Sequence, residues 1–156
     1  MAVVGTPTTP VVITRDQVRM FLRDRADKNI LLDDVQFSDD ELNLAIEMAT
    51  ENFNAVTPPS AFIPSTFPNK YVLLVGTVRF LLNSESFLQI RNQASWSDGD
   101  VANIGIHDKS LAYAQLAQQL KAEYDELVRG LKTALNMESA YNHLSSGYRA
   151  TSRYHG

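Results

Sequence analysis

The clearest pattern along the chain is an apolar stripe between Asp108 and about Asn136. Polar residues such as Lys121, Glu126 and Lys132 fall between the apolar positions and are expected to cover the other side of a helix. Asp108 is suited to be the N-cap, where a carboxylate also favours the positive end of the helix dipole. The predicted helix is roughly 40 Å long. The stripe, at steps of three or four residues, consists of Tyr113, Leu116, Leu120, Tyr124, Leu127, Leu131 and Leu135.

A shorter first helix is predicted to begin after Thr14, its N-cap, and to continue to about Ala26. Val18, Phe21 and Leu22 share its apolar face. Another face carries arginines four residues apart with aspartates close by, namely Arg15, Arg19, Arg23, Asp16, Asp24 and Asp27. This pattern is typical of a solvated face with local ion pairs. A row of arginines that binds phosphate is the alternative.

The second helix has the most complete start signal in the chain. Ser38-Asp39-Asp40-Glu41 is a capping box, in which Ser38 is the N-cap and Glu41 bonds back to it. Phe37 precedes the cap and is expected to pack against Leu42 as a hydrophobic staple. The helix is predicted to end near Asn54. Its expected buried face consists of Leu42, Ile46, Ala49 and Phe53.

A proline-rich crossing over residues 55–68 separates this helix from the next one. Its four prolines exclude a regular helix or strand, because each lacks an N–H and has a fixed φ. Phe62, Ile63 and Phe67 in the crossing are expected to fill a gap between helices.

A third helix is predicted from about Asn69 to Phe87, where the run YVLLVGTVRFLL is apolar almost all round. Such a helix is typically central in the fold. Its β-branched residues keep a strand as the alternative. Arg79 within this run needs a carboxylate partner or a route to solvent, and we place it at the edge of the helix.

The segment before the long helix changes character. Asn92–Trp96 and Val101–Ile106 flank a tip that contains Asp98 and Gly99. An Asp-Gly pair favours a type I′ turn, which needs positive φ at both central positions. We therefore predict a β-hairpin or an extended loop over 92–106. Trp96, the single tryptophan, is either an exposed binding anchor beside the tip or packed on the long helix.

Neither end of the chain shows helical periodicity. We divide the sequence into an extended arm at 1–13, a helical domain at 14–136 and a tail at 137–156. The arm contains Val11, Val12 and Ile13, which could add a strand to a neighbouring molecule. The tail is either disordered or becomes ordered on a partner. Its candidate anchors are tyrosines and arginines: Tyr141, Tyr148, Arg149, Arg153 and Tyr154.

Together these patterns predict a mainly α protein, a bundle of about four helices with one long C-terminal helix, a β-hairpin or extended loop before it, and extended termini. A length of 156 residues, 44% of them hydrophobic, suits one domain with one core. The lack of cysteine excludes disulfides and thiolate chemistry. The N-terminus lacks the basic region of a signal peptide, and no apolar run is expected to reach the ~20 residues of a membrane span.

Charge is distributed unevenly although the net value is only −4. Residues 1–68 carry five basic and ten acidic residues, a net of −5, and residues 69–156 carry nine and eight, a net of +1. Between Asp33 and Glu51 lie seven carboxylates and no basic residue. This stretch is either a solvated helix face or a surface that repels DNA or meets a basic partner.

No stretch of the sequence indicates catalysis, a cofactor or a metal. His107, His143 and His155 are scattered, without the spacing of a zinc site. There is no phosphate-binding glycine loop and no serine in a nucleophile motif. The carboxylates of the capping region are explained by capping. We therefore expect a structural protein and not an enzyme.

The order of elements resembles the head–tail connector proteins of tailed bacteriophages, also called adaptor or neck proteins. The run SWSDGDVANIGIHDKSLAYAQLAQQLKAEYDEL carries most of the likeness. The resemblance rests on element order and style and extends over most of the chain. It includes the extended N-terminus, the capped acidic helix, the proline-rich crossing and the long helix after a loop.

This resemblance implies a subunit that forms a closed ring of about twelve copies beneath the portal protein. The ring would join the capsid to a downstream tail or neck protein in the virion, after assembly in the host cytoplasm. Double-stranded DNA would pass through its lumen without specific binding. The two ends and the loop at 92–106 would contact neighbours. Candidate lumen-facing acidic residues are Asp33, Asp34, Asp39, Asp40 and Glu47.

A second class of function fits the same composition. A small cytosolic helical module that binds one partner, such as a regulator or an assembly chaperone, would also lack catalytic motifs. It predicts a small fixed oligomer and a dispensable tail, whereas a connector predicts a ring. Within the virion, a tail-completion role is not separated from an adaptor role by the sequence.

Overall fold

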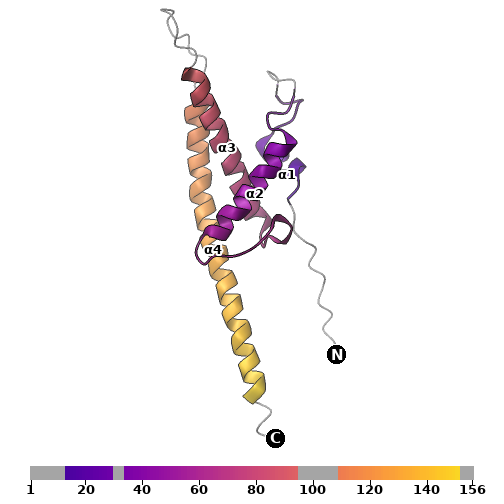
Figure 1. Ribbon diagram of the computed structural model, residues 1–156, viewed down its shortest axis with the longest axis vertical. Coiled ribbons are helices and arrows are strands. Elements are labelled where there is room, and N and C mark those ends of the chain that lie inside the picture. Colours follow the sequence, from indigo (N-terminus) through magenta and orange to yellow (C-terminus); the bar gives the residue numbers. More distant parts are fainter. Residues whose placement is uncertain (1–12, 30–33, 95–108, 152–156) are drawn as a thin grey trace, which may run out of the picture.

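The computed structural model describes residues 13–29, 34–94 and 109–151. Within these ranges the chain forms four α-helices and one 3₁₀ turn (Figure 1). They are α1 (Arg15–Leu22), α2 (Asp39–Ala55), the 3₁₀ turn η1 (Pro64–Thr66), α3 (Lys70–Ala94) and α4 (Lys109–Thr151). The prediction of a mainly α protein with a long C-terminal helix is therefore confirmed.

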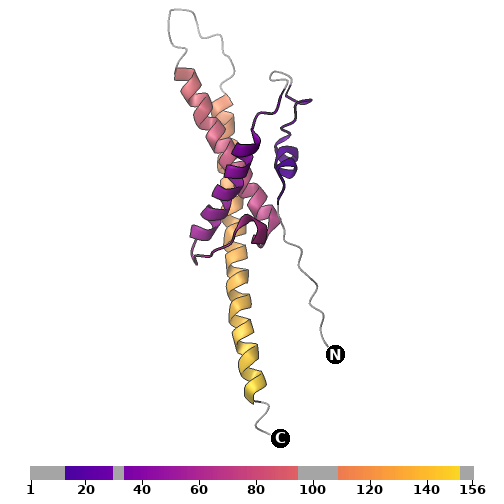
Figure 2. The same cartoon turned by 45° about the vertical axis from the view of Figure 1, so that its right-hand side comes forward.

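The helices α3 and α4 form an antiparallel hairpin, against which α2 and α1 pack in turn (Figure 1). The second view shows the same order of layers, with α2 crossing the hairpin near its middle (Figure 2). At 1.5 Å per residue, the 43 residues of α4 span about 65 Å. In both views the C-terminal half of α4 extends beyond the other described helices.

The core lies where α2, α3 and α4 meet. Leu42 and Phe53 of α2, Leu73 of α3 and Tyr124 of α4 are at most 1% exposed. Gly76 allows α3 and α4 to pack closely, because a Cβ at this position would lie 2.7 Å from Cε2 of Tyr124. The apolar third helix is thus central, as its sequence predicted.

The first helix begins as predicted but ends early. Thr14 and Gln17 form a reciprocal capping box at its start. The end comes at Leu22 and not near Ala26, because Arg23 adopts the left-handed conformation with φ of 59°. A residue in that conformation closes a helix, and its N–H bonds back to carbonyls of the last turn.

The second helix matches its sequence signals. The Ser38 hydroxyl accepts a hydrogen bond from the N–H of Glu41, whose carboxylate accepts one from the N–H of Ser38 at 2.7 Å. Phe37 and Leu42 are both buried in the one core, as expected for a hydrophobic staple. The predicted buried face is confirmed at all four of its positions, Leu42, Ile46, Ala49 and Phe53.

The proline-rich crossing is held by aromatic packing. The rings of Phe53 and Phe67 meet edge to face with centroids 4.8 Å apart, and Phe62 lies 6.0 Å from Phe53. Such pairs stabilise beyond the area they bury. Ile63 was expected to fill the same gap, but it is 56% exposed, so that prediction is wrong. Ile63 instead precedes η1, whose turn directs Phe67 inward.

The third and fourth helices are longer than predicted. α3 continues past Phe87 to Ala94, so residues 92–94 of the expected hairpin are helical. Residues 95–108, with the rest of the expected hairpin, lie outside the described ranges. α4 continues past Asn136 to Thr151 and includes most of the predicted tail. No proline follows Pro68 in the sequence, so nothing stops either helix by removing a backbone donor.

The predicted stripe on α4 is confirmed at six of its seven positions. Tyr124 is buried, and the other five are partly buried against the core: Tyr113, Leu120, Leu127, Leu131 and Leu135. Leu116 is the exception, with 45% exposure, and the core also includes Ala117 and Val128. Lys132 was expected on the solvent side, but it is only 4% exposed. The correction has a simple cause: neighbouring elements decide which part of a wide apolar face is covered.

By length and composition, one helix among the described residues could cross a membrane. It is Lys70–Arg91 in α3, with a mean hydropathy of 1.2 over its most apolar window. The expectation that no apolar run approaches this length is therefore corrected. More than half of that window, 56%, is buried inside the protein, as in the core helix of a soluble fold.

Candidate functional site

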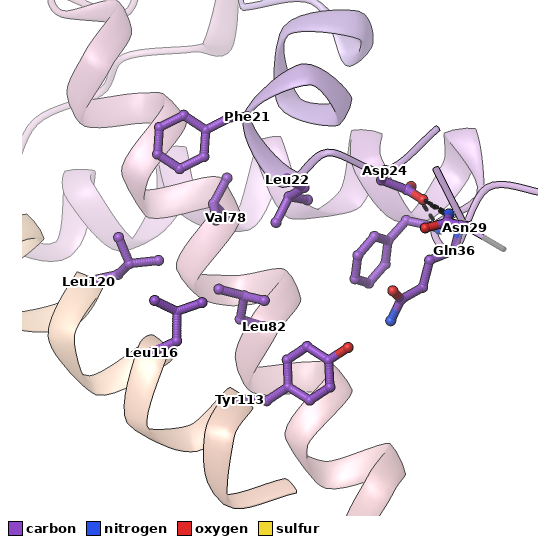
Figure 3. A pocket seen from close by; sticks show the side chains of 11 residues that line it. Phe21, Leu22, Asp24, Asn29, Gln36, Val78, Leu82, Tyr113, Leu116 and Leu120 are labelled. Atoms are coloured by element: carbon purple, nitrogen blue, oxygen red, sulfur yellow. Dashed lines mark hydrogen bonds between the residues drawn. The ribbon is translucent and has the colours of Figure 1, made fainter. Parts of the chain in front are cut away.

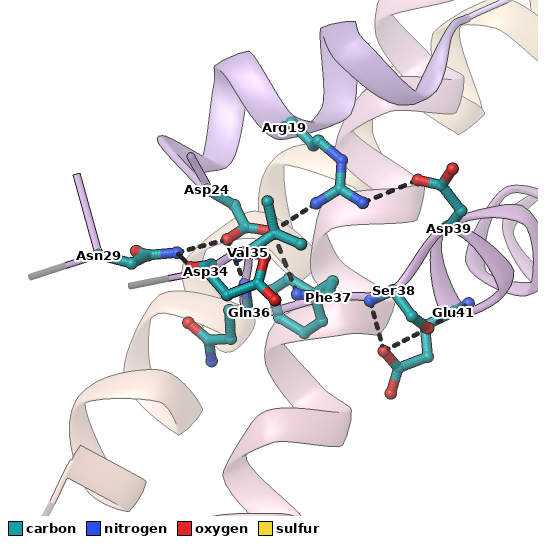
Figure 4. Close-up of polar contacts among 10 residues, drawn as sticks. All are labelled: Arg19, Asp24, Asn29, Asp34, Val35, Gln36, Phe37, Ser38, Asp39 and Glu41. Atoms are coloured by element: carbon teal, nitrogen blue, oxygen red, sulfur yellow. Dashed lines mark hydrogen bonds and ion pairs between the residues drawn. The ribbon is translucent and has the colours of Figure 1, made fainter. Parts of the chain in front are cut away.

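A cluster of polar groups ties α1 to the start of α2 around the buried carboxylate of Asp24 (Figure 4). Asp24 accepts hydrogen bonds from Arg19 Nη1 at 3.0 Å and from Asn29 Nδ2 at 2.8 Å. It also accepts from the backbone N–H groups of Gln36 at 2.6 Å and Phe37 at 3.1 Å. A buried carboxylate with four donors is well satisfied. Its role is to hold the loop between the two helices.

Arg19 extends this cluster to the second helix. Its Nη2 lies 2.8 Å from Oδ1 of Asp39, which also pairs with Arg15 at 2.5 Å (Figure 4). The hydrogen bond from Arg19 lowers the pKa of the Asp39 carboxyl, with Arg15 adding to the same effect. The prediction of local ion pairs along the arginine row is confirmed for Arg19 with Asp24. Arg15 pairs instead with Asp39 of α2.

The acidic surface is therefore smaller than the sequence indicated. Asp39 is balanced by two arginines, and the Glu41 carboxylate is engaged in the capping box. Asp34, Asp40 and Glu47 are exposed. Asp33 lies outside the described residues. An acidic face remains on α2. Asp39 lies at the edge of this face, where its ion pairs join α2 to α1.

A pocket of about 380 Å³ opens between α1, α3 and α4 (Figure 3). Its wall is mostly apolar, with a polar end formed by Asp24, Asn29 and Gln36. Phe21 is 43% exposed at this pocket and Leu116 is 45% exposed, so part of the apolar wall meets solvent. A space of this size is large enough for one or two apolar side chains and falls at the low end of ligand sites.

A second polar contact anchors the proline-rich crossing to α4. The Lys132 amine donates hydrogen bonds to the carbonyl of Pro58 at 2.8 Å and to the Ser60 hydroxyl at 2.7 Å. It also lies 4.3 Å from the centre of the Phe53 ring, a cation–π contact. Burial lowers the pKa of this amine. Each of these contacts is structural, and together they clamp the crossing on the long helix.

A third contact joins α2, α3 and α4 at Tyr124. The Arg79 guanidinium lies 4.8 Å from the centre of the Tyr124 ring and donates a hydrogen bond to Asn52. Arg79 thus sits at the helix edge, as predicted, and its hydrogen-bond partner is an amide instead of a carboxylate. Burial raises the pKa of the Tyr124 hydroxyl to about 12, against the opposing effect of the nearby Arg79 charge.

Large apolar side chains are exposed at both ends of the α3–α4 hairpin. At one end lie Phe87, Leu88 and Ile90 of α3 and Leu111 of α4. At the other end, beyond the body, lie Met137 at 53% and Tyr141 at 64% exposure. These two groups of exposed apolar side chains are candidate contact surfaces.

The structure places the predicted contact residues in different environments. Ile13 is 2% exposed and belongs to the core, so its assignment as a neighbour contact is wrong. Tyr141 is exposed on α4. Tyr148 and Arg149 lie within the helical range of α4, and no side-chain environment is described for them. The remaining predicted contacts lie outside the described residues: Val11, Val12, Trp96, Asp98, Gly99, Arg153 and Tyr154.

Sequence reasoning missed Lys132 and the pocket. The clamp at Lys132 had no local signal, because its partners are more than seventy residues away in the chain. The pocket is formed by three helices, and its wall had been assigned to the core.

Within the described ranges, no group of three metal-ligating side chains comes together. No protein-family model, curated protein or solved structure matches this chain.

Proposed function

We propose that this protein is a structural subunit of the neck of a tailed bacteriophage, a head–tail connector that forms a ring under the portal. The observation that carries the proposal is the shape of α4. Its 43 residues greatly exceed what the small body needs, and its C-terminal half extends past the other described helices (Figure 1). A helix of this kind gains its stability from tertiary or partner contacts, because an isolated helix is marginal in water.

The α3–α4 hairpin has a candidate surface for contacts between copies at each of its two ends. One end exposes Phe87, Ile90 and Leu111, and the other exposes Met137 and Tyr141. Residues 110–120 of α4 contain no charged side chain, so close packing of a neighbour there requires no burial of charge. Different surfaces on one subunit suit heterologous contacts, which close into a ring when the rotation allows it.

The charge distribution is compatible with passage of DNA through such a ring. Asp40, Glu47 and Glu51 are exposed along α2. A lumen lined by this helix would repel phosphates and let DNA slide, whereas a basic lumen would retain it. Asp39 does not belong to this surface in our proposal, because Arg15 and Arg19 offset its charge.

Native mass spectrometry of the full-length protein tests the proposal, first alone and then with the portal protein of the same phage. We expect a ring of about a dozen copies, alone or formed on the portal. A monomer or dimer that does not bind the portal would refute the connector function.

The pocket favours a second candidate, a helical module that binds one partner. Its partly exposed wall at Phe21 and Leu116 could receive an apolar side chain from another protein. This function predicts a small fixed oligomer and saturable binding that is weakened by Leu116→Glu. The same mass measurement distinguishes the two candidates, because only the connector forms a large ring.

A further inference from the structure

The pocket between α1, α3 and α4 offers polar groups that could bind a further ligand. Among the described residues, neither the side-chain amide of Gln36 nor the hydroxyl of Tyr113 has a hydrogen-bond partner. Figure 3 shows both side chains at one end of the pocket. An amide and a hydroxyl can each donate and accept hydrogen bonds. Together with the apolar wall, they suit an occupant that has apolar side chains and exposed peptide groups.

The charge of the pocket narrows the choice of occupant. Asp24 is the one charged residue among the described residues that line it. Its carboxylate already accepts four hydrogen bonds, one of them from the Arg19 guanidinium. A charged group that entered the pocket would lose its water without gaining an unpaired opposite charge. The pocket therefore favours an uncharged occupant.

The N-terminal arm of the chain has this chemistry. Residues 1–12 contain no charged side chain, and half of them are apolar: Met1, Ala2, Val3, Val4, Val11 and Val12. The other segments outside the described residues, at 30–33, 95–108 and 152–156, each contain at least one charged residue. Of these segments, the arm is thus the one that matches an uncharged and mostly apolar pocket.

The sequence of the arm also predicts how far its apolar residues reach. Every residue from Thr6 to Ile13 is proline, threonine, valine or isoleucine, which favour an extended chain. At about 3.3 Å per residue, Val4 would lie roughly 30 Å from Ile13. Ile13 is buried at the start of α1, whose 8 residues span only about 12 Å. Because the pocket lies beside Leu22 at the far end of α1, the arm reaches its own pocket only by reversing within this stiff run.

We propose that the Val3-Val4 segment of one copy occupies the pocket of a neighbouring copy, where Gln36 and Tyr113 bind the peptide groups of the arm. The arm and the pocket are different surfaces, so the contact is heterologous. Each copy gives its arm to one neighbour and receives an arm from another, as all members of a closed ring can do at once. The inference rests on the proposed function only in requiring that copies of the chain associate.

Disulfide trapping tests the contact, because the chain contains no cysteine. Val3→Cys and Val4→Cys each place a thiol on the arm, and both are made because neighbouring side chains of an extended chain point to opposite sides. Leu116→Cys places the second thiol on the pocket wall, where Leu116 is 45% exposed. Leu44→Cys is the matched control, because Leu44 is 50% exposed on α2 and does not line the pocket.

Each full-length arm variant is co-expressed with tagged Leu116→Cys or tagged Leu44→Cys and purified under reducing conditions. The proteins are then oxidised in a glutathione buffer, alone and on the portal protein, and the mixed disulfide is identified by its size on a non-reducing gel. Circular dichroism of each variant alone confirms that it is folded. A disulfide needs two Cα atoms within about 7 Å.

We expect one of the two arm variants to form the mixed disulfide with Leu116→Cys about tenfold faster than with Leu44→Cys, because its thiol is held at the pocket. Rates that do not differ between Leu116→Cys and Leu44→Cys, for both arm variants, would overturn the contact.

A chain that carries both the faster arm cysteine and Leu116→Cys separates a neighbour's pocket from the chain's own. If the arm enters the next copy, oxidation links the chains into covalent multimers. An internal disulfide that leaves the chains as monomers would overturn the proposal in favour of an arm that folds back on its own pocket.

The result is separable from the test of the proposed function. If the wild-type protein forms a ring but the mixed disulfide forms no faster than the control, the arm contact is wrong and the connector function stands. If the chains cross-link into multimers but the wild type forms no ring and ignores the portal, the arm contact stands and the connector function is wrong.

Discussion

Alanine should have opposite effects at two glycines in the middle of helices. At Gly76 of α3, a new Cβ would lie 2.7 Å from Cε2 of Tyr124 and 3.3 Å from Cβ of Ala49. At Gly130 of α4, no described atom lies within 4 Å of the same position, apart from the adjoining residues and nearby backbone of its own helix. Both changes add the same methyl group to a helix. They differ only in whether the methyl group has room.

The magnitudes follow from two terms. Replacing glycine by alanine in a helix raises the unfolding free energy by about 0.5–1 kcal/mol, since alanine is the better helix former. At Gly76 the methyl group must also displace the buried Tyr124 ring, and overpacking of this kind costs about 1–3 kcal/mol. The helix term cancels when the two variants are compared. Gly76→Ala should therefore be less stable than Gly130→Ala by about 1–3 kcal/mol.

Urea denaturation followed by circular dichroism at one protein concentration measures this difference. Since 1 kcal/mol shifts the melting temperature by about 2–4 °C at this size, a thermal melt also resolves it. A double-mutant cycle with Tyr124→Leu identifies the cause, because the cost at Gly76 should fall when the ring is removed. If Gly76→Ala stabilises the protein as much as Gly130→Ala does, the close packing of α3 on α4 is refuted.

Three further changes probe the buried polar groups. The pKa of the Tyr124 hydroxyl should be near 10 in the unfolded chain and about 12 in the folded protein. Its contribution to stability is therefore present below pH 10 and lost between pH 10 and 12. Unfolding curves of Tyr124→Phe at alkaline pH should lack this loss of stability. In a urea titration, Asp24→Asn should lower the unfolding free energy by about 3 kcal/mol, because the new side-chain NH₂ would face buried hydrogen-bond donors. The control Asp34→Asn changes an exposed residue and should alter the unfolding free energy by less than about 0.5 kcal/mol. Lys132→Met should cost about 1–3 kcal/mol at neutral pH through the orphaned Pro58 carbonyl. Burial lowers the pKa of the Lys132 amine in the folded state, so between that lowered pKa and 10.5 the unfolded chain binds more protons than the folded chain. The stability of the wild type relative to Lys132→Met should therefore increase as the pH rises through this window. An unchanged difference in unfolding free energy would contradict the burial of this amine.

The candidate site was predictable in some parts and not in others. The ion pair of Arg19 with Asp24 could be expected from the spacing of charges, because partners within one or two turns are set by local geometry. The choice of Asp39 as the partner of Arg15 and Arg19 could not, since it depends on how α2 packs beside α1. The continuation of α4 to Thr151 could not be predicted, because residues 137–156 show no clear periodicity of a buried helix face.

The sequence by itself determined where helices begin and which face of α2 is buried. Thr14 and Ser38 cap their helices through contacts within three residues, so the local chain contains all the atoms involved. Tertiary structure decided the limits of the covered face of α4, which includes Lys132 and leaves Leu116 partly exposed, because these depend on surfaces far away in the chain. Lys132 shows the difference most clearly. It looks like a solvated residue between leucines, yet the proline-rich crossing supplies a carbonyl, a hydroxyl and an aromatic ring that make its burial favourable.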